Sequence, residues 1–475
     1  MRCFCMSLFV LTTGLGAVAE DWPTYLHDNR RSGITSESVS LPLREAWHYV
    51  HEAPPQPAWE GPAKWDAYSG RKDLKSMRNF DPAFHLTAAS DMVFFGSSVT
   101  DAAHCLDAAS GEERWCYYTD GPVRLPPTFH EGHAYFGSDD GYAYCVDVEG
   151  GRLTWRHAPA PRERSVPVNG KLVSLSPVRT GVLIDNGTAY FAASLLPWRP
   201  SYLCAVSAAT GTFDGSFGYA SEHQGVVFQG AMLMSKDNLY VLQGRSAPVI
   251  FSRAGGEMLG TVGDSGGVVA LITEDDTFIA GSPNQKEDRF SETAGGHAGD
   301  QLAFYESANR LVIANGVAYL QAEGELKAFD RTRYLGLQKE LIAVNKRREA
   351  LEQERKALNE SEDADKGERM KTLDAALAEV KERASAIRKE ARDCYLWRVA
   401  CDLPHALIKV RDALIAGGTG AIALFDAGTG EERWRSTVDG AAHGLAVANG
   451  RLLVSTDTGH IYAYASAMVG TPGQG

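Results

Sequence analysis

Residues Asp107–Trp115 read DAASGEERW, and residues Asp426–Trp434 read DAGTGEERW. A weaker copy of the same phrase, DVEGGRLTW, occupies Asp147–Trp155. The tryptophans that end the first two copies along the chain, Trp115 and Trp155, are 40 residues apart. Self-similarity with a period of about 20–50 residues is typical of solenoids, propellers and other repeat architectures. The phrase therefore indicates a repeated structural unit and not a single catalytic motif.

Each copy has the composition of a tight turn between two strands. The aspartate and the serine or threonine can satisfy backbone groups of the turn, and the glycine supplies a left-handed step. The tryptophan then starts the next strand and offers a large apolar face for burial. With strands also predicted before each copy, and hairpin turns at Asp139–Gly141 and Asp457–Gly459, each unit holds about four short antiparallel strands, as a propeller blade does. We assign this structural role to Asp107, Gly111, Trp115, Asp147, Gly151, Trp155, Asp426, Thr429, Gly430 and Trp434.

The pattern A-x-D-x-x-T-G-x-x-x-W resembles the tryptophan-docking repeat of the pyrroloquinoline-quinone (PQQ)-type β-propellers. The copy that ends at Trp434 keeps the aspartate, threonine and glycine of the pattern. A fourth copy, around Thr210 and Gly211, has Ser207 in place of the aspartate and Gly215 in place of the tryptophan. The chain is similar to quinoprotein-like propellers and to the propeller component of outer-membrane β-barrel assembly. The resemblance implies that the tryptophan of one blade packs against the turn of its neighbour.

Strands at the two ends of the chain complete one another. Arg44–Val50 has the pattern of a lone final strand, and Arg451–Ala465 lacks a following tryptophan strand. Together they would form one blade, so that the ring closes through the two termini and leaves no long exposed edge. Counting the units predicts an all-β fold, a β-propeller of about eight blades. Because the middle units are degenerate, seven blades is the alternative.

One segment, residues 335–393, departs from the strand pattern. Its apolar residues recur at alternating steps of about four and three residues, first between Leu337 and Leu358 and again between Met370 and Ala391. This spacing predicts two coiled-coil helices. Joined by an acidic turn, they would fold into an antiparallel hairpin inserted in one blade. The hairpin is either a decoration that packs on itself or an arm for docking or oligomerisation.

The N-terminal residues have the composition of a secretory signal peptide. Arg2 is followed by a mostly apolar run and by the small-residue cleavage pattern Ala17-Val18-Ala19. No cysteine stands at the cleavage point, so a lipid anchor is not indicated, and no later run reaches the ~18 apolar residues of a membrane span. We therefore predict a periplasmic or secreted protein with a signal peptide at 1–19, propeller segments at 20–334 and 394–466, the hairpin at 335–393 and a flexible tail at 467–475.

The cysteines and the net charge limit the kinds of site and partner that we expect. Cys105 and Cys116 flank one copy of the repeat, and Cys394 and Cys401 lie close together in the sequence. Disulfides are permitted outside the cytoplasm, but buried free thiols are an equal alternative. No Cys/His spacing suggests a zinc site. The formal net charge of −13 argues against a nucleic-acid partner.

The resemblance allows two classes of function. A PQQ-dependent dehydrogenase would hold PQQ and calcium, which needs about six to eight oxygen ligands, and the adjacent cysteine pair typical of those enzymes is missing after the signal segment. We therefore expect no catalytic, cofactor-binding or metal-binding residues, and a scaffold that binds protein partners through the 335–393 arm in envelope or outer-membrane protein assembly. The alternatives are a PQQ-dependent oxidoreductase and a propeller that binds glycans or small ligands, for which Trp59, Trp65 and the long loop Ser282–Asp300 are the candidates.

Overall fold

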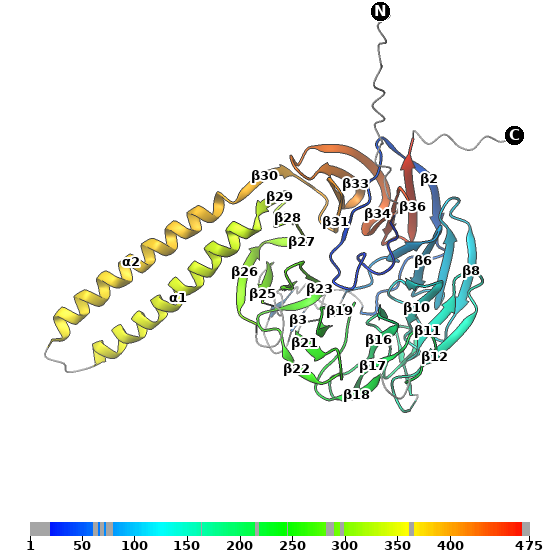
Figure 1. Cartoon of the computed structure of the whole chain (residues 1–475), viewed down its shortest axis with the longest axis horizontal. Helices are drawn as coiled ribbons and strands as arrows, with labels where there is room; N and C mark the ends of the chain where they lie inside the picture. Colours follow the sequence, from blue (N-terminus) through cyan, green and yellow to red (C-terminus); the bar gives the residue numbers. More distant parts are fainter. Residues whose placement is uncertain are drawn as a thin grey trace, which may run out of the picture.

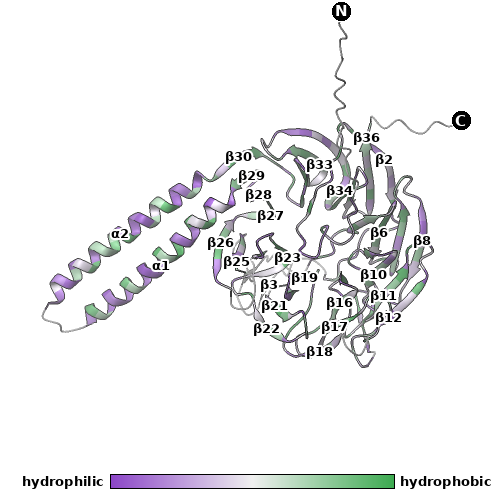
Figure 2. Ribbon diagram, viewed as in Figure 1, coloured by the Kyte–Doolittle hydropathy of each residue, from purple (hydrophilic) through white to green (hydrophobic). Residues whose placement is uncertain are grey.

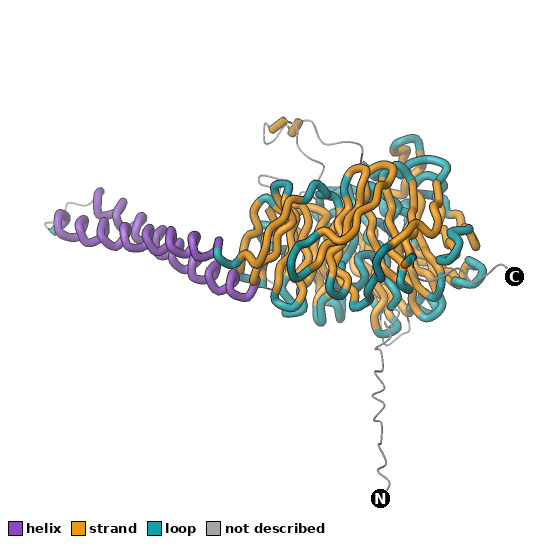
Figure 3. The backbone as a smooth tube through the Cα atoms, turned by 90° about the horizontal axis from the view of Figure 1, so that it is seen from above, coloured by secondary structure: helices purple, strands orange, loops and turns teal. Residues whose placement is uncertain are grey.

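The computed structural model describes residues 20–59, 65–66, 71–72, 79–162, 164–213, 218–244, 246–281, 289–294, 299–360 and 365–467. The predicted signal peptide, most of the predicted tail, Gly215 and most of the Ser282–Asp300 loop lie outside these residues. The strands form a ring of sheets, a β-propeller, and two helices project from its rim (Figure 1). Viewed from the side, the two helices continue outward from the ring as one rod (Figure 3).

Six of the sheets have four antiparallel strands each. The first three are β5 (Leu86–Ala89), β6 (Met92–Ser97), β7 (Ala102–Asp107) and β8 (Glu113–Tyr118); β9 (Thr128–His130), β10 (His133–Gly137), β11 (Ala143–Asp147) and β12 (Leu153–His157); and β15 (Leu183–Asp185), β16 (Thr188–Ala193), β17 (Ser201–Ser207) and β18 (Tyr219–His223). The next three are β19 (Leu233–Met234), β20 (Asn238–Gln243), β21 (Ser246–Ser252) and β22 (Met258–Thr261); β23 (Gly266–Ile272), β24 (Phe278–Gly281), β25 (Arg289–Thr293) and β26 (Gln301–Glu306); and β27 (Ala308–Ala314), β28 (Val317–Ala322), β29 (Glu325–Asp330) and β30 (Tyr395–Ala400). Two further hairpins are β3 (Trp65–Asp66) with β4 (Arg71–Lys72) and β13 (Ser165–Val168) with β14 (Lys171–Ser174).

A seventh, eight-stranded sheet joins the two ends of the chain. Its order is β1 (Ile34–Thr35), β31 (Ala406–Val410), β32 (Ala413–Gly417), β33 (Thr419–Asp426), β34 (Glu432–Ala448), β35 (Arg451–Thr456), β36 (His460–Ser466) and β2 (Leu43–Val50). The long strand β34 pairs with β33 along its first part and with β35 along its second part. Strand β2 pairs antiparallel with β36, Leu43 opposite Ser466. The predicted closure of the ring through both termini is therefore confirmed.

The core lies between neighbouring sheets, because both faces of the inner strands are covered. In β6, Val93 and Phe95 pack into one apolar cluster, whereas Met92 and Phe94 pack into the next. Successive side chains of a strand point to opposite faces, so a strand buried on both faces reads as the continuous apolar run MVFFGS. The inner strands are therefore packed on both faces.

Tryptophans tie neighbouring sheets together. The indole N–H groups of Trp47, Trp115, Trp155 and Trp397 donate hydrogen bonds to the carbonyls of Ala108, Val148, Ala208 and Ala427 at 2.9, 2.7, 2.8 and 3.1 Å. Each acceptor follows the first residue of a repeat turn in the adjacent sheet. The packing implied by the resemblance is therefore present at four sheet boundaries.

The turn glycines fit this contact because they have no side chain. A Cβ atom at Gly111 would lie 2.6 Å from Trp47, one at Gly151 would lie 2.7 Å from Trp115, and both backbones have positive φ. The aspartate organises the same turn: Asp107 accepts hydrogen bonds from the backbone N–H groups of Ala109 and Ser110, both at 2.9 Å. A hydrogen bond from Arg114 is the main cause that lowers the pKa of Asp107 to about 2. Asp426 makes the same backbone contacts with Gly428 and Thr429, and Asp147 binds the N–H of Gly150.

The fourth copy of the repeat departs from our prediction. Gly215 lies outside the described residues, and Tyr219 takes the tryptophan position, since it stands opposite Ala205 as Trp155 stands opposite Cys145. A Cβ atom at Gly256, in the next sheet, would collide with the Tyr219 ring. More residues separate Gly211 from Tyr219 than separate Gly151 from Trp155, so alignment by spacing alone did not find this aromatic residue.

Trp434 also differs from the other members of its set. It is only half-buried, and its N–H donates to the carbonyl of Leu43 at 3.1 Å. Its ring meets Tyr464 edge-on, with centroids 5.3 Å apart. Among the described residues no repeat turn faces Trp434, because the neighbouring half of the sheet is closed by the N-terminal strand β2.

Helices α1 (Arg331–Glu360) and α2 (Lys366–Arg392) connect β29 to β30. The first helix begins at Arg331, before residue 335, because its first turns are packed on the ring next to Phe329 and Tyr305. The helices run in opposite directions, as shown by the pairs Arg383–Glu340 at 2.7 Å and Arg355–Asp374 at 2.6 Å. Apolar and polar residues alternate along both (Figure 2).

Candidate functional site

A buried ion network holds the segment before β5 against one face of the ring. Asp139 contacts Arg124 at 2.7 Å and Arg179 at 2.7 Å, and Arg124 also contacts Asp81 at 2.7 Å. Burial opposes ionisation of Asp139, but the two guanidinium groups outweigh it and lower its pKa. The predicted turn at Asp139–Gly141 is confirmed, between β10 and β11. The ionic role of the Asp139 side chain was not visible in the sequence, since its partners are distant along the chain.

Trp59 belongs to the same region and is not the free aromatic that our glycan-binding alternative requires. Its N–H donates to Gln229 Oε1 at 3.0 Å, and the Arg179 guanidinium lies 5.6 Å from the centre of its ring. Both contacts hold the half-buried ring in place. Trp65 lies in the short strand β3.

A cavity of about 80 Å³ lies where the innermost strands converge, and we call it the axial cavity. Its walls come from β5, β23, β27, β31 and β34, and residues Tyr25 to Gly33 of the N-terminal segment complete it. This segment crosses the centre of the ring (Figure 1). The polar groups that line the axial cavity are Tyr25, Arg31, Ser32, Asn79, His85, Arg310 and His443.

The described lining of the axial cavity is basic and has no carboxylate. Arg310 makes no ion pair among the described residues, and it donates a hydrogen bond to the carbonyl of Asn309 at 2.8 Å. Arg31 is buried and donates to the carbonyls of Met232 at 3.1 Å and Tyr25 at 2.7 Å. Burial lowers the pKa of Arg31 to about 10. Two guanidinium groups therefore line this cavity, whose described lining has no carboxylate.

Histidines surround the Arg310 guanidinium. Burial, the neighbouring His405, Arg310 and His85 together lower the pKa of His443 to about 3. Burial lowers the pKa of His85 to about 4, with Arg310 adding to the effect. The rings of His405 and His443 are 4.7 Å apart. At neutral pH these imidazoles are uncharged, so Arg310 supplies the positive charge among them.

The axial cavity does not fit the calcium ion of a PQQ enzyme. Calcium takes about six to eight oxygen ligands and prefers carboxylates, and the described lining contains none. Its donors are N–H groups of arginine and histidine, which suit anions. We derive no catalytic step through PQQ from these residues.

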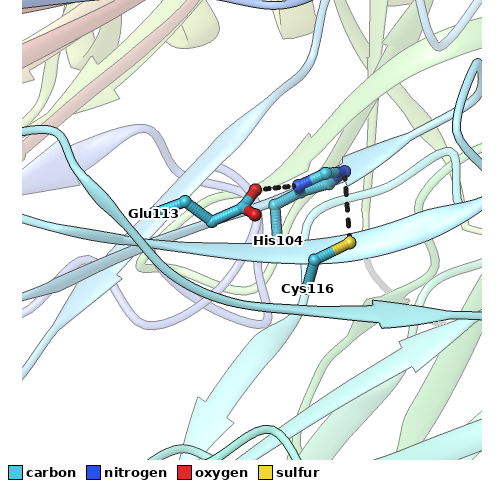
Figure 4. Close-up of side chains that lie close together, drawn as sticks. All are labelled: His104, Glu113 and Cys116. Atoms are coloured by element: carbon cyan, nitrogen blue, oxygen red, sulfur yellow. Dashed lines mark hydrogen bonds and ion pairs between the residues drawn. The ribbon is translucent and has the colours of Figure 1, made fainter.

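A second cluster joins His104 of β7 to Glu113 and Cys116 of β8 (Figure 4). Glu113 Oε2 lies 2.7 Å from His104 Nδ1, and Cys116 Sγ lies 3.8 Å from His104 Nε2. The acid and the thiol thus contact opposite nitrogens of one ring, and one potential ligand atom from each of the three residues lies within 4.8 Å of the others. Burial raises the pKa of Cys116 to about 11, which keeps it a protonated, weakly nucleophilic thiol.

The six cysteines that the structure describes are free thiols. Cys105 stands opposite Trp115 and the adjacent Cys116 stands opposite His104, so the two thiols point to opposite faces of the sheet. Cys394 and Cys401 are buried in separate apolar clusters. Of the two alternatives that the sequence left open, the structure has the free thiols.

The base of the two-helix arm is anchored in the ring. Arg331 is buried and pairs with Glu292, and it also contacts Asp275 at 3.0 Å and Thr277 at 3.1 Å. The Tyr334 hydroxyl donates to the carbonyl of Phe304 at 2.6 Å. The chain leaves and re-enters the ring at one point, where the N–H of Asp330 donates to the carbonyl of Cys394 at 2.9 Å.

Residues 58–257 and 396–468 match the model of a family described as outer membrane protein assembly factor BamB, a family of PQQ repeats. The chain belongs to this PQQ-repeat propeller family. The matched residues contain the repeat turns, whereas β22 to β29 and both helices lie between the two matched segments. Comparison with curated proteins finds no match.

Solved structures share the propeller fold at low identity. The quinohemoprotein alcohol dehydrogenase from Comamonas testosteroni is 10% identical with a TM-score of 0.56, over 96% of this chain and 82% of that one. A europium-containing methanol dehydrogenase is 9% identical with a TM-score of 0.55, over 94% of this chain and 98% of that one. The computationally designed Ika8 protein is 10% identical with a TM-score of 0.51, over 81% and 96%. At identities this low, the structural similarity shows a common fold and does not indicate a function.

Proposed function

We propose that this protein is a non-catalytic, extracytoplasmic scaffold, an eight-bladed propeller whose coiled-coil arm docks a protein partner. The blade count follows if each half of the eight-stranded sheet, joined through β34, is one blade beside the six four-stranded sheets. The domain limits are those predicted from the sequence, with the arm extended back to Arg331. Neither described helix is long and apolar enough to cross a membrane.

The surface of the arm is the observation that carries this proposal. The two helices contain sixteen Lys and Arg and ten Asp and Glu, in a chain with a formal net charge of −13. Ten of their basic side chains are exposed and make no ion pair among the described residues: Arg333, Lys339, Lys346, Arg347, Lys356, Lys371, Lys381, Arg388, Lys389 and Arg392. Complementary charge steers association and selects partners. The arm therefore suits a partner with an acidic face.

The apolar residues of the arm are used for its own packing. Leu373, Leu377, Val380 and Ile387 of α2 are buried, as is Leu358 of α1. Because the apolar seam is closed, the two helices can form a stiff rod that holds its basic surface away from the ring (Figure 3). Recognition through this surface then depends on charge and shape. The family description points to a partner in outer-membrane protein assembly.

Two variants test the arm. Replacing residues 345–379 with a short glycine turn removes the outer arm and keeps the Arg383–Glu340 pair at its base. The double substitution Lys346→Glu and Arg347→Glu changes the charge and keeps the helix. A photo-crosslinking residue at Lys356 should capture one discrete envelope protein in the parent background, and capture should fall at least about tenfold with Lys346→Glu and Arg347→Glu.

The matched control is Arg162→Glu, a charge reversal at an exposed position on the ring. It should leave the crosslink unchanged, and both arm variants should keep the melting temperature of the ring. An undiminished crosslink after charge reversal would contradict the proposal. Capture of anionic vesicles instead of a protein would replace the partner with a membrane surface. Dye reduction after addition of PQQ and calcium would favour the oxidoreductase alternative over a scaffold.

A further inference from the structure

The axial cavity presents an electrostatic problem that the scaffold function does not address. A guanidinium group taken out of water is costly unless it is paired with an acid. Elsewhere in this ring the buried arginines obey this rule: Arg124 and Arg179 bind Asp139, and Arg331 binds Glu292. Arg310 faces the axial cavity with no carboxylate among the described residues. Arg310, which is half-buried, therefore lacks among the described residues the acidic partner that each of these three arginines has.

Polar groups around Arg310 remain available to a ligand. His443 Nδ1 is buried and has no hydrogen-bond partner among the described residues. His85 is oriented by the carbonyl of Phe80, 3.2 Å from its Nε2. Since a carbonyl only accepts, that nitrogen carries the proton and the ring is fixed in one tautomer. The ring of His405 packs against that of His443, with centroids 4.7 Å apart.

The size of the axial cavity limits the ligand. Its volume is about 80 Å³. A cavity holds one water for roughly every 10–15 Å³ measured in this way, so the space suits a group of about five heavy atoms. Its N–H donors suit oxygen acceptors, and Arg310 can offer two parallel donors to one oxyanion.

We propose that the axial cavity binds one small oxyanion, with Arg310 as the charged anchor and His443 as a neutral hydrogen-bond donor. The class includes inorganic phosphate, sulfate and carboxylates of two or three carbons. Tyr25 and Arg31 of the N-terminal segment also line the cavity. A bound anion would therefore link this segment to β27 and β34 at the ring centre and stabilise the closed ring.

Thermal unfolding tests this site in the full-length protein. Sodium phosphate, sodium sulfate and sodium acetate are titrated against sodium chloride at equal ionic strength. At least one oxyanion should raise the melting temperature saturably above the chloride control, and the three salts distinguish phosphate-like from carboxylate ligands. Calorimetric titration with the stabilising anion should give a stoichiometry of about one.

The Arg310→Gln substitution should weaken that anion at least about tenfold, since hydrogen bonds to a charged group are the strong ones. In chloride alone it should raise the melting temperature, because it removes the unpaired charge. The control Arg162→Gln removes an exposed ring arginine and should change neither result. If Arg310→Gln does not fold, Arg310→Lys keeps the charge, loses the paired donors and should show weakened binding. Equal stabilisation by chloride, or undiminished binding in both Arg310 variants, would overturn the proposal.

Discussion

The contact between Gly151 and Trp115 allows the repeat to be tested one methyl group at a time. The Gly151 backbone has φ +63°, and a Cβ atom there would lie 2.7 Å from the Trp115 indole. A left-handed backbone costs a non-glycine residue about 1–2 kcal/mol, and forcing extra volume against a packed ring costs about 1–3 kcal/mol. Gly151→Ala should therefore lower the free energy of unfolding by about 2–5 kcal/mol.

Two comparisons separate these contributions. Gly132 has φ +76° and no atom within 4 Å of its would-be Cβ, so Gly132→Ala should cost only the backbone contribution. Trp115 is 8% exposed, and Trp115→Ala should cost about 3–5 kcal/mol. In the Trp115→Ala background, Gly151→Ala should cost no more than Gly132→Ala does. The resulting coupling between the two positions should be about 1–3 kcal/mol.

The assay is urea unfolding followed by far-ultraviolet circular dichroism, which reports β-structure without depending on the altered tryptophan. Hydrogen exchange of β8 and β12 amides would locate the loosened boundary between the two sheets. Our reasoning fails if Gly151→Ala and Gly132→Ala cost the same in the parent protein. It also fails if Gly151→Ala costs as much without the indole as with it.

Three further outcomes follow from side chains with unusual surroundings. Burial holds the pKa of His85 at about 4, below its ordinary 6.5, so the unfolded chain takes up the proton first as the pH falls. The free energy of unfolding should therefore decrease by up to ~1.4 kcal/mol per pH unit between pH 6.5 and pH 4. Urea midpoints across this range should fall less steeply in His85→Gln, and an equal slope would contradict this account. Maleimide near pH 8 should label Cys116 before the other described cysteines, because those are buried, and slowly, because the Cys116 thiol has a pKa of about 11. Equally rapid labelling of every thiol would be inconsistent with the packing. Tyr219→Phe should leave the melting temperature unchanged or higher, because the buried hydroxyl has no hydrogen-bond partner among the described residues. Tyr219→Ala should lower the free energy of unfolding by roughly 2–3 kcal/mol. A large decrease in the melting temperature of Tyr219→Phe would mean that the hydroxyl is hydrogen-bonded.

The repeat was readable from sequence wherever its spacing is regular. Asp147, Gly151 and Trp155 stand at fixed separations, and each performs a local task in a turn or at the start of a strand. Spacing did not find the aromatic residue of the fourth copy, because more residues separate Gly211 from Tyr219 than separate Gly151 from Trp155. Spacing identifies a residue only while loop length is constant.

The candidate site at the ring centre could not be predicted in the same way. Arg31, His85, Arg310 and His443 come from four separate parts of the chain, and none stands in a recognisable motif. Each is unremarkable beside its sequence neighbours. What distinguishes the cluster is that its described lining has no carboxylate, which becomes apparent only after the strands are placed around one axis.

The sequence by itself determined the repeating unit, the closure of the ring by its two ends and the interruption that becomes the arm. These features depend on alternation, turn chemistry and helical spacing, which act between residues close along the chain or repeat at a fixed period. The tertiary structure alone decided which tryptophan meets which turn, that Asp139 is shared by two arginines, and that Arg310 faces a cavity whose described lining has no acid. Those outcomes depend on distance in space, because burial and Coulomb interactions are set by what surrounds a group after folding and not by what precedes it in the chain.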